Sequence, residues 1–363
     1  MVRLLRDWYV ACRSHELPAG SFPRAPLATT VVGVPLVLFR DERGTAAALL
    51  DRCAHRNVPL SLGRVTRPGT LECGYHGWRF DAEGRCVGVP GLCRPLEVTR
   101  RVSSYAVREQ DGLVWVCPAA DFTPHDPPPR VPFVDDERYA HVRREVEVEA
   151  TLHATIENAL DVPHTAFLHR GLFRGGKTNR IVAVVRRFRD RVEAEYLGEP
   201  KPPGLVAKIL APHGAGTVRH WDRFFLPSVA QVEYRLGEDT HFIVTSYCTP
   251  VSDFRTRMLA VVSFRTPLPR KMVSTLLEPV ALRIFRQDAE VLRKQTETIR
   301  RFGGEQFSST EIDVLGPSIW RVLRDAERLE QSDSTRAEAG GSLEASREGA
   351  AAYPVVHQVD LEV

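Results

Sequence analysis

The sequence predicts an α+β protein of two domains, in which an antiparallel β domain precedes a domain of mixed helices and strands. Two observations predict this order. Short strand-like runs separated by turn residues fill the chain up to about residue 118, and both helical and strand patterns follow a proline-rich segment. With 363 residues, 43% of them hydrophobic, the chain can bury two or three hydrophobic cores.

The N-terminal region, residues 1–118, is predicted to be the antiparallel β domain. Its strand-like runs are rich in apolar residues and read "TTVVGVPLVLFRD", "TAAALLDRC", "TLECGYHGWRF" and "GLVWVC". Turn-forming residues separate them, as in "RPG" at 67–69 and "DAEG" at 81–84. Strands joined by such short turns pair in the antiparallel sense.

The rest of the chain divides into a linker, a mixed domain and a tail. Residues 119–133 are predicted to form a stiff linker, because this stretch is dense in proline and has no apolar periodicity. Residues 134–330 contain the helical segment "ATLHATIENAL", strands such as "RIVAVVRRF" and "THFIVTSYCTP", and a long helix over about 275–302. Small polar residues then predict a flexible tail over 331–363.

Charge and cysteine content argue against several classes of protein. The net charge is only +3, and acidic and basic residues are interspersed, so we expect no nucleic-acid partner. No apolar run approaches the length of about 18 residues that a membrane span needs, and the first residues lack a signal-peptide pattern. Seven cysteines, an odd number, argue against a disulfide framework. We therefore expect a cytoplasmic protein whose reduced cysteines are available to bind metal.

Two short motifs in the N-terminal region each pair one cysteine with one histidine. Cys53 and His55 are separated by one residue. Cys73 and His76 are separated by two residues. Thiolate and imidazole together bind either zinc or an iron–sulfur cluster, but structural zinc sites of this composition usually keep both cysteines in one pair. A [2Fe–2S] cluster with two cysteines on one iron and two histidines on the other takes one ligand of each type from each loop, which favours the cluster.

Two histidines follow the first predicted helix of the mixed domain. His164 and His169 are five residues apart, a spacing that points side chains in different directions on an unbroken helix. Pro163 breaks the helix, so both rings can converge on one point. Histidines near a helix end are also common in cores and on surfaces, so this pair alone does not establish a metal site.

A carboxylate on the late helix is the candidate third ligand. Asp288 lies between Phe285 and Leu292, in the apolar stripe of this helix rather than on its arginine-rich face. A buried carboxylate needs a cation, either a metal ion or an arginine. With the two histidines it completes the two-histidine, one-carboxylate ligand set of non-haem iron oxygenases. Glu157 and Glu290 are the next candidates for this ligand.

In these motifs the sequence resembles the oxygenase (α) component of Rieske non-haem iron ring-hydroxylating oxygenases. "CAHRNVPLSLGR" and "LECGYHGWRFDAEGRC" resemble the cluster loops, and "TIENALDVPHTAFLHRG" and "IFRQDAEVLRKQ" resemble the iron site. The resemblance extends from residue 5 to about residue 325. It is greatest to the branch of vanillate and dicamba O-demethylases and of steroid and natural-product hydroxylases. Ala54 stands where many relatives have proline, at a position that binds no metal.

The resemblance implies the fold, the cofactors and the assembly. It implies a Rieske domain that holds a [2Fe–2S] cluster and a helix-grip, START-like catalytic domain that holds mononuclear Fe(II). It also implies a homotrimer, with a hexamer left open. In this assembly Asp161 joins His76 of one chain to His164 of its neighbour, and Asn158 lies near the iron.

The implied reaction uses O2 to hydroxylate, demethylate or desaturate a small molecule. Electrons come from NAD(P)H through a separate reductase, with or without a ferredoxin, because the chain shows no dinucleotide-binding motif. Apolar residues between about 175 and 265 predict a mainly hydrophobic substrate, aromatic or polycyclic. Segment 206–216 is either a lid over this substrate or a plain surface loop.

Two other readings of the chain stay open. One is a Rieske electron carrier or redox sensor whose second domain is a catalytically inactive lipid-binding domain. The other is a structural protein stabilised by zinc. The intact set of His164, His169 and Asp288 argues against the first reading, because loss of catalysis would remove the iron ligands first.

Overall fold

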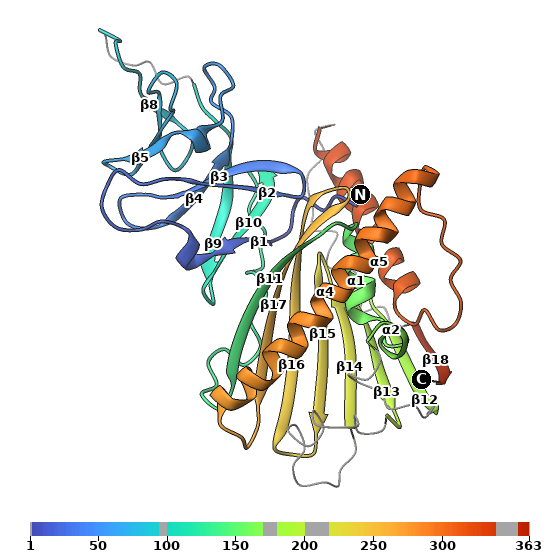
Figure 1. Ribbon diagram of the computed structural model, residues 1–363. Helices are drawn as coiled ribbons and strands as arrows, with labels where there is room; N and C mark the ends of the chain where they lie inside the picture. The colour runs from blue at the N-terminus through green and yellow to red at the C-terminus, as the bar shows by residue number, and fades with distance from the viewer. Residues whose placement is uncertain (1, 94–99, 170–179, 200–217, 339–354, 363) are drawn as a thin grey trace. The chain divides into compact units, whose positions relative to one another are not determined.

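The chain folds into two structural units, coloured blue to teal and green to red in Figure 1. The computed structural model describes residues 2–93, 100–169, 180–199, 218–338 and 355–362. Residues 3–130 together with 249–251 form the N-terminal unit. The C-terminal unit consists of Val2, residues 131–248 and the described residues from 252 onward.

The N-terminal unit consists of two antiparallel sheets. The strands of the larger sheet are β1 (Tyr9–Arg13), β2 (Leu27–Val31), β3 (Val34–Arg40), β4 (Ala46–Leu50), β9 (Ser104–Gln110) and β10 (Leu113–Ala120). Those of the smaller sheet are β5 (Arg64–Thr66), β6 (Thr70–Glu72), β7 (Arg79–Phe80) and β8 (Cys86–Gly88). The strand orders are β1-β10-β9-β4-β3-β2 and β5-β6-β7-β8. Two short 3-10 helices span Ser14–Glu16 and Leu60–Leu62. The predicted antiparallel β architecture is confirmed.

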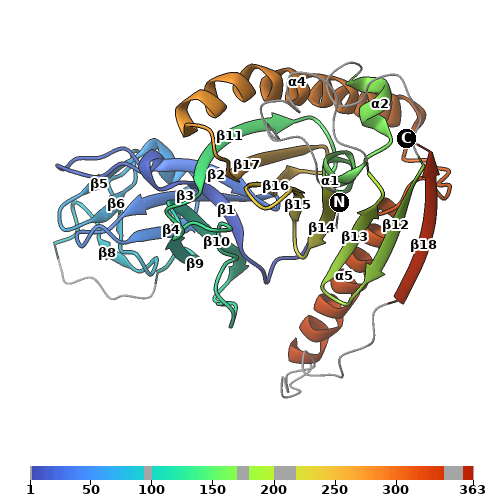
Figure 2. The same cartoon turned by 90° about the horizontal axis from the view of Figure 1, so that it is seen from below.

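The C-terminal unit is one eight-stranded antiparallel sheet with helices packed on it (Figures 1 and 2). Its strands are β11 (Ala140–Val148), β12 (Arg180–Arg187), β13 (Arg191–Leu197), β14 (Val218–Phe225), β15 (Val229–Leu236), β16 (Thr240–Ser252), β17 (Arg255–Arg265) and β18 (Val355–Glu362). The strand order is β11-β17-β16-β15-β14-β13-β12-β18. The described helices are α1 (Leu152–Leu160), α2 (His164–Leu168), α4 (Arg270–Phe302) and α5 (Gly316–Glu338). This confirms the mixed α+β domain.

The helices lie against one face of this sheet. α1 packs on β14, β15 and β17 and also contacts α4 and α5. The strands show the corresponding period of two: alternate residues of β14, from Val218 to Phe224, are buried. Val273 of α4 belongs to the same hydrophobic cluster as Val218 of β14. The helices therefore cover the face of the sheet on which the even-numbered residues of β14 lie.

A few residues determine where the helices begin and end. The Thr151 hydroxyl accepts a hydrogen bond from the N–H of Ala154 and caps α1. α4 was expected to begin at about residue 275, where its apolar stripe starts, but it begins directly after Pro269, whose fixed φ suits the start of a helix. It ends at Gly303, which has a φ of 80°. Among the described residues no helix is both long and apolar enough to cross a membrane.

The C-terminal residues differ from the flexible tail expected over 331–363. α5 continues to Glu338, and residues 355–362 form β18, which pairs with the whole length of β12. The expectation rested on the small polar residues of the tail. It overlooked the β-branched residues at its end, which gain backbone hydrogen bonds from the otherwise open edge of the sheet.

Candidate metal centres

Two loops of the N-terminal unit that carry Cys53 and Cys73 have the same backbone hydrogen bonds. In each loop the cysteine N–H donates to the carbonyl five residues later, and the N–H four residues later donates back to the cysteine carbonyl. All four distances lie between 2.8 and 3.0 Å. The fifth residue of each loop, Asn57 or Gly77, has a positive φ of 61° or 68°, a conformation that these two residue types tolerate. The loops are thus two copies of one turn.

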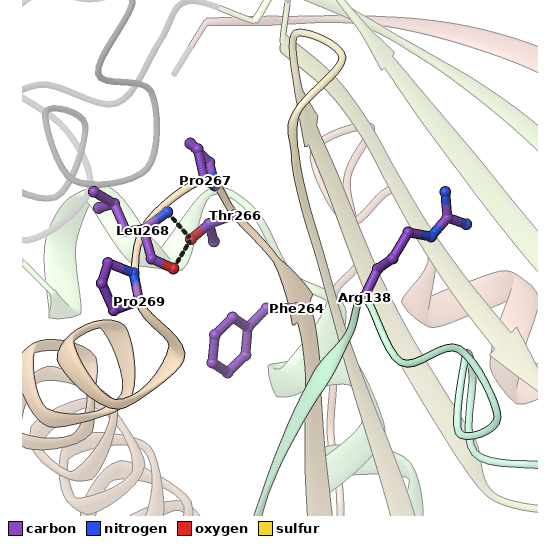
Figure 3. Close-up of a pocket in the computed structure, with 6 residues that line it drawn as sticks. All are labelled: Arg138, Phe264, Thr266, Pro267, Leu268 and Pro269. Atoms are coloured by element: carbon purple, nitrogen blue, oxygen red, sulfur yellow. Dashed lines mark hydrogen bonds between the residues drawn. The ribbon is translucent and has the colours of Figure 1, made fainter.

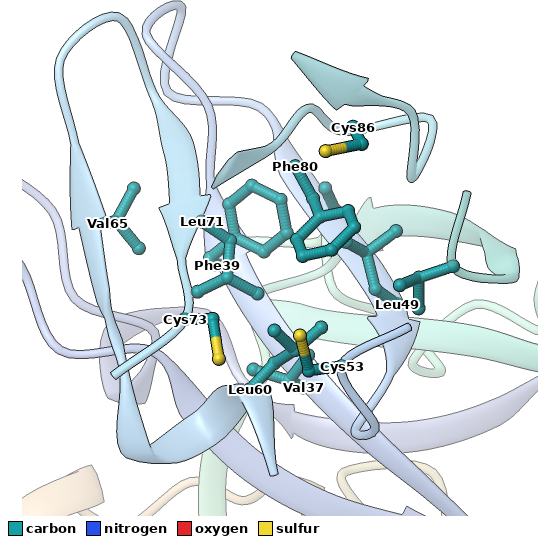
Figure 4. Close-up of a cluster of buried hydrophobic side chains, with 12 residues drawn as sticks. Val37, Phe39, Leu49, Cys53, Leu60, Val65, Leu71, Cys73, Phe80 and Cys86 are labelled. Atoms are coloured by element: carbon teal, nitrogen blue, oxygen red, sulfur yellow. The ribbon is translucent and has the colours of Figure 1, made fainter. Parts of the chain in front are cut away.

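The two cysteine side chains lie inside the hydrophobic core of this unit. Cys53 is 1% exposed and Cys73 is 3% exposed, and both belong to a cluster that includes Leu60 and Phe80 (Figure 4). Burial raises the pKa of the Cys53 thiol, and a hydrogen bond with Cys73 raises it further. A bound metal ion would reverse this effect and hold both sulfurs as thiolates. Cys86 lies beside Phe80, away from the pair (Figure 4).

The two histidines of these loops lie together nearer the surface. The ring centroids of His55 and His76 are 4.6 Å apart, and His76 is exposed. Trp78 stacks on His55 with an interplanar angle of 2°. The Nδ1 atom of His55 is buried and has no hydrogen-bond partner among the described residues, as expected for an atom that binds a metal. Buried cysteines and outer histidines fit a cluster with one iron inside the unit and one iron near its surface.

The C-terminal unit brings His164, His169 and Asp288 together. His164 begins α2, His169 follows that helix directly, and Asp288 lies in α4. The two Nε2 atoms of His164 and His169 are 3.2 Å apart. The Oδ1 atom of Asp288 lies 3.0 Å from Nε2 of His169 and 3.6 Å from Nε2 of His164. Neighbouring ligands that each lie about 2.1 Å from one ion are separated by roughly 3 Å, so this triangle fits a single metal ion.

The other ring nitrogens of these histidines face oxygen atoms. Nδ1–H of His169 donates to Oε1 of Gln287 over 3.0 Å. Nδ1 of His164 lies 3.4 Å from Oδ2 of Asp161. A proton on Nδ1 of each ring would leave Nε2, the atom nearest Asp288, free to bind a metal ion, as in metal-binding histidines.

The charge of this group favours a cation. Burial lowers the pKa of His164, but the carboxylates of Asp161 and Asp288 outweigh burial and raise it to about 9. Oδ1 of Asp288 is buried and accepts no hydrogen bond among the described residues. The residues present therefore fit a divalent ion in chemistry and in spacing.

The alternative carboxylates lie elsewhere. Glu157 faces His153, at 3.9 Å, and burial raises the pKa of Glu157. Glu290 is exposed and forms an ion pair with Arg293. Asn158 lies half-buried on α1, one turn before Asp161, and its predicted place near an iron stays a prediction.

A buried polar group on the sheet was missed in the sequence. His220 of β14 is 1% exposed, and its Nδ1 and Nε2 lie 2.7 Å from Glu199 and 2.9 Å from Asp222. Its ring stacks between Tyr196 and Tyr234. Burial lowers the pKa of His220, but the two carboxylates outweigh burial and raise it to about 9. The available signal was the alternation that places His220 and Asp222 on the buried face of β14.

A pocket of about 350 Å³ lies where β17 ends and α4 begins (Figure 3). Its lining residues are Arg138, Phe264, Thr266, Pro267, Leu268 and Pro269. It includes none of the predicted metal ligands. The predicted lid at 206–216 lies outside the described residues.

Comparison with known proteins identifies the family. Residues 7–106 match the family model of the Rieske [2Fe-2S] domain. Residues 148–328 match that of the vanillate O-demethylase oxygenase C-terminal domain. The chain belongs to the Rieske oxygenases. The first domain of this oxygenase includes the Cys/His loops, and the second includes the two histidines and Asp288.

Individual relatives agree with this assignment. The oxygenase is 27% identical over 342 residues to the vanillate O-demethylase oxygenase subunit of a Pseudomonas strain, covering 87% of this chain and 92% of that one. It is 35% identical over 171 residues to the chloroplastic chlorophyllide a oxygenase of Chlamydomonas reinhardtii, covering 47% of this chain. That match spans only 25% of the relative's length. The crystal structure of dicamba monooxygenase bound to dicamba has the same fold, with a TM-score of 0.76 at 24% identity, covering 92% of this chain and 100% of that one.

Proposed function

We propose that the chain is the terminal oxygenase component of a Rieske non-haem iron system. It uses O2, and electrons from an NAD(P)H-dependent reductase with or without a ferredoxin, to hydroxylate, demethylate or desaturate a mainly hydrophobic aromatic or polycyclic molecule. The observation that carries this proposal is the convergence of His164 Nε2, His169 Nε2 and Asp288 Oδ1 in a domain that belongs to an oxygenase family.

In this proposal each set of ligands holds one cofactor. Cys53 and Cys73 hold the inner iron of the [2Fe–2S] cluster, and His55 and His76 hold the outer iron. His164, His169 and Asp288, whose ligand atoms lie within 4.8 Å of one another, would hold Fe(II). When bound, the cluster supplies single electrons, and Fe(II) supplies the site at which O2 is activated.

The surrounding residues keep the ligands in place. Gln287 holds the His169 ring by accepting its Nδ1 proton, and the Asp161 carboxylate lies 3.4 Å from Nδ1 of His164, where its charge favours a proton on that nitrogen. His169 is 1% exposed, which keeps water from the inner side of the iron site. Packing of α4 against α1 fixes the separation of Asp288 from the histidines.

The proposal also covers how the chains assemble and in which compartment the protein works. We place the oxygenase in a homotrimer, where Asp161 accepts a hydrogen bond from His76 of a neighbouring chain. The cysteines that the structure describes are all free, in keeping with a reducing cytoplasm.

The test of this function is an iron and activity measurement on purified protein. We expect about three iron atoms per chain, the absorption of a Rieske cluster, and O2 uptake driven by NADH and a reductase in the presence of an aromatic methyl ether. A protein with only the two cluster irons and no O2 uptake would instead be the electron carrier with an inactive second domain. Stimulation by highly charged, sugar-like compounds alone would contradict the substrate class.

Replacing His55 by Cys tests the ligands of the cluster. We expect the variant to keep a [2Fe–2S] cluster with an altered electron paramagnetic resonance spectrum and a lower reduction potential, because thiolate donates more charge to iron than imidazole does. His125→Cys, at an exposed histidine of the same unit, is the control and should leave the spectrum unchanged. An unaltered spectrum in the His55 variant would show that this ligand assignment is wrong.

A further inference from the structure

The two histidines of the Cys/His loops have different neighbours. The ring of Tyr75 lies 3.8 Å from that of His76, whereas Trp78 stacks on His55 with 4.6 Å between the ring centroids. In the proposed trimer, Asp161 of a neighbouring chain binds His76, so that histidine serves the exit of electrons from the cluster. His55 and Trp78 lie at the other ligand of the outer iron, where electrons can enter.

Trp78 connects His55 with the surface. Its indole is half-buried and packs against the hydrophobic core of the N-terminal unit. The guanidinium carbon of Arg100 lies 5.7 Å from the centroid of this ring, within the range of a cation–π contact, and Arg100 is exposed. A protein bound at Arg100 would therefore be separated from a ligand of the outer iron by one indole ring.

The surface around this indole carries unbalanced positive charge. Arg56 follows His55 directly and is exposed, as is Arg100, and neither forms an ion pair with a residue that the structure describes. The carboxylates that flank the two loops, those of Asp51 and Glu72, are already bound, the first by the N–H and hydroxyl of a serine and the second by an arginine. Exposed charges of one sign attract partners of the opposite sign.

Apolar side chains lie beside these charges. Segment 87–92 packs against the second loop, because a Cβ atom on Gly77, the residue before the tryptophan, would lie 2.9 Å from the ring of Pro90. Val87 and Leu92 of this segment are 47% and 43% exposed. Exposed apolar groups bordered by arginines are typical of a surface that binds another protein.

We propose that Trp78, Arg56, Arg100 and residues 87–92 form a donor face, which binds an acidic redox protein and passes its electrons to the cluster through Trp78 and His55. The inference rests on the proposed oxygenase function and names the chemistry of the partner that supplies the electrons. In each transfer, the reduced flavin or iron–sulfur centre of the partner loses one electron and the [2Fe–2S] cluster gains it. No bond is made or broken.

The proposal separates the entry of electrons from their exit. Entry uses Trp78 and His55, and exit uses His76 and the carboxylate of a neighbouring chain. A donor at Trp78 needs no contact with His76, so the cluster can be reduced while the assembly stays intact. Transfer between proteins slows steeply with distance, and the stacked indole shortens the gap between the donor and the outer iron.

Reduction of the oxidised holoenzyme in the absence of O2, followed by rapid freezing, tests the donor face. The probe is a reduced plant-type [2Fe–2S] ferredoxin, which is acidic and has a potential low enough to reduce a Rieske cluster. We expect the Rieske paramagnetic signal to appear about tenfold or more slowly at physiological salt than at low salt, because ions screen the attraction between opposite charges. A rate that is independent of salt, or that rises with salt, would overturn the proposal.

Variants without the positive charge assign this effect to the two arginines. Arg56→Gln and Arg100→Gln should each lower the second-order rate constant by about threefold or more, and calorimetry should show weaker binding of oxidised ferredoxin. Arg101→Gln is the matched control, because Arg101 is exposed but pairs with Asp121 at 3.0 Å, so rate and affinity should persist. Reduced methyl viologen, a small cation that needs no docking surface, should reduce every variant at least as fast as the parent.

Trp78 variants test the path of the electron. Trp78→Leu should slow reduction at saturating ferredoxin while calorimetric binding persists, and Trp78→Phe, which keeps an aromatic ring on His55, should restore part of the rate. The Rieske absorption shows whether both variants hold the cluster, and the two arginine variants decide the proposal where Trp78→Leu does not. Reduction of Trp78→Leu at the parent rate would refute the path through the indole.

Assembly and iron content separate this inference from other outcomes. Arg56→Gln and Arg100→Gln should elute from size-exclusion chromatography as the parent does. A smaller species would show that this face binds a second copy of the chain, which overturns the donor face. A preparation with full iron and normal O2 uptake, in which ferredoxin reduces both arginine variants at the parent rate, refutes the donor face alone. A preparation without the third iron refutes the oxygenase function, whatever the rates of reduction.

Discussion

Asp288→Ala lowers the iron content from about three to about two atoms per chain and abolishes oxygenation, while the Rieske absorption and its paramagnetic spectrum stay intact. The reason lies in the geometry of the site. Asp288 Oδ1 is the atom that faces both His164 and His169, and two histidines alone bind a divalent ion weakly. Elemental analysis together with the visible spectrum measures both cofactors in one sample.

Glu290→Ala is the control for this variant. Glu290 lies two residues further along α4, is exposed and pairs with Arg293, so its loss should leave iron content and turnover unchanged. Full iron retention with normal turnover in Asp288→Ala would contradict the assignment. Glu157 would then be the carboxylate to test, although it faces His153 rather than the two histidines.

Asp161→Asn lowers turnover by about 10- to 100-fold while both cofactors stay loaded. The Asp161 carboxylate accepts the N–H of His164 over 3.3 Å and lies 3.4 Å from Nδ1 of that ring. Asn keeps the size of the side chain and an oxygen for the backbone contact, but it loses the charge that holds the imidazole proton. In the proposed trimer the same carboxylate also meets His76 of a neighbouring chain, so the reduced cluster loses its route to the iron.

Rapid-mixing measurement of cluster reoxidation in the substrate-bound enzyme tests this role directly. Asp325→Asn, in an exposed ion pair with Arg328 on α5, should reoxidise at the parent rate. Size-exclusion chromatography shows whether the assembly persists in the Asp161 variant. Reoxidation of Asp161→Asn at the parent rate, with the assembly intact, would mean that electrons take another route.

Local patterns in the sequence predicted much of the fold and the grouping at the iron site. The helical pattern of "ATLHATIENAL" and the strand patterns of "RIVAVVRRF" and "THFIVTSYCTP" are local signals, and these segments form α1, β12 and β16. The convergence of His164 and His169 was predicted from a helix break at Pro163, and in the structure α1 ends at Leu160 and α2 begins directly after Pro163. The ligand roles of these residues, and those of the Cys/His loops, stay predictions.

What the sequence analysis missed depends on contacts between distant segments. Glu199 and His220 are 21 residues apart and meet only because β13 and β14 are neighbours in the sheet. Gln287 directly precedes Asp288, but its contact with His169 joins residues that are 118 apart in the sequence. Strand pairing and helix packing bring such residues together. No short repeat of apolar and polar residues in the sequence predicts these contacts.

The pairing of β18 with β12 has a consequence for how the protein is made. β12 carries alternating apolar residues, and without β18 its backbone would lie at an open sheet edge that can recruit other chains. β18 exposes His357 and Asp360, and polar or charged residues on an edge strand discourage such association. A polypeptide released early from the ribosome, before residues 355–362 are added, would therefore be prone to aggregate even though every metal ligand is already present.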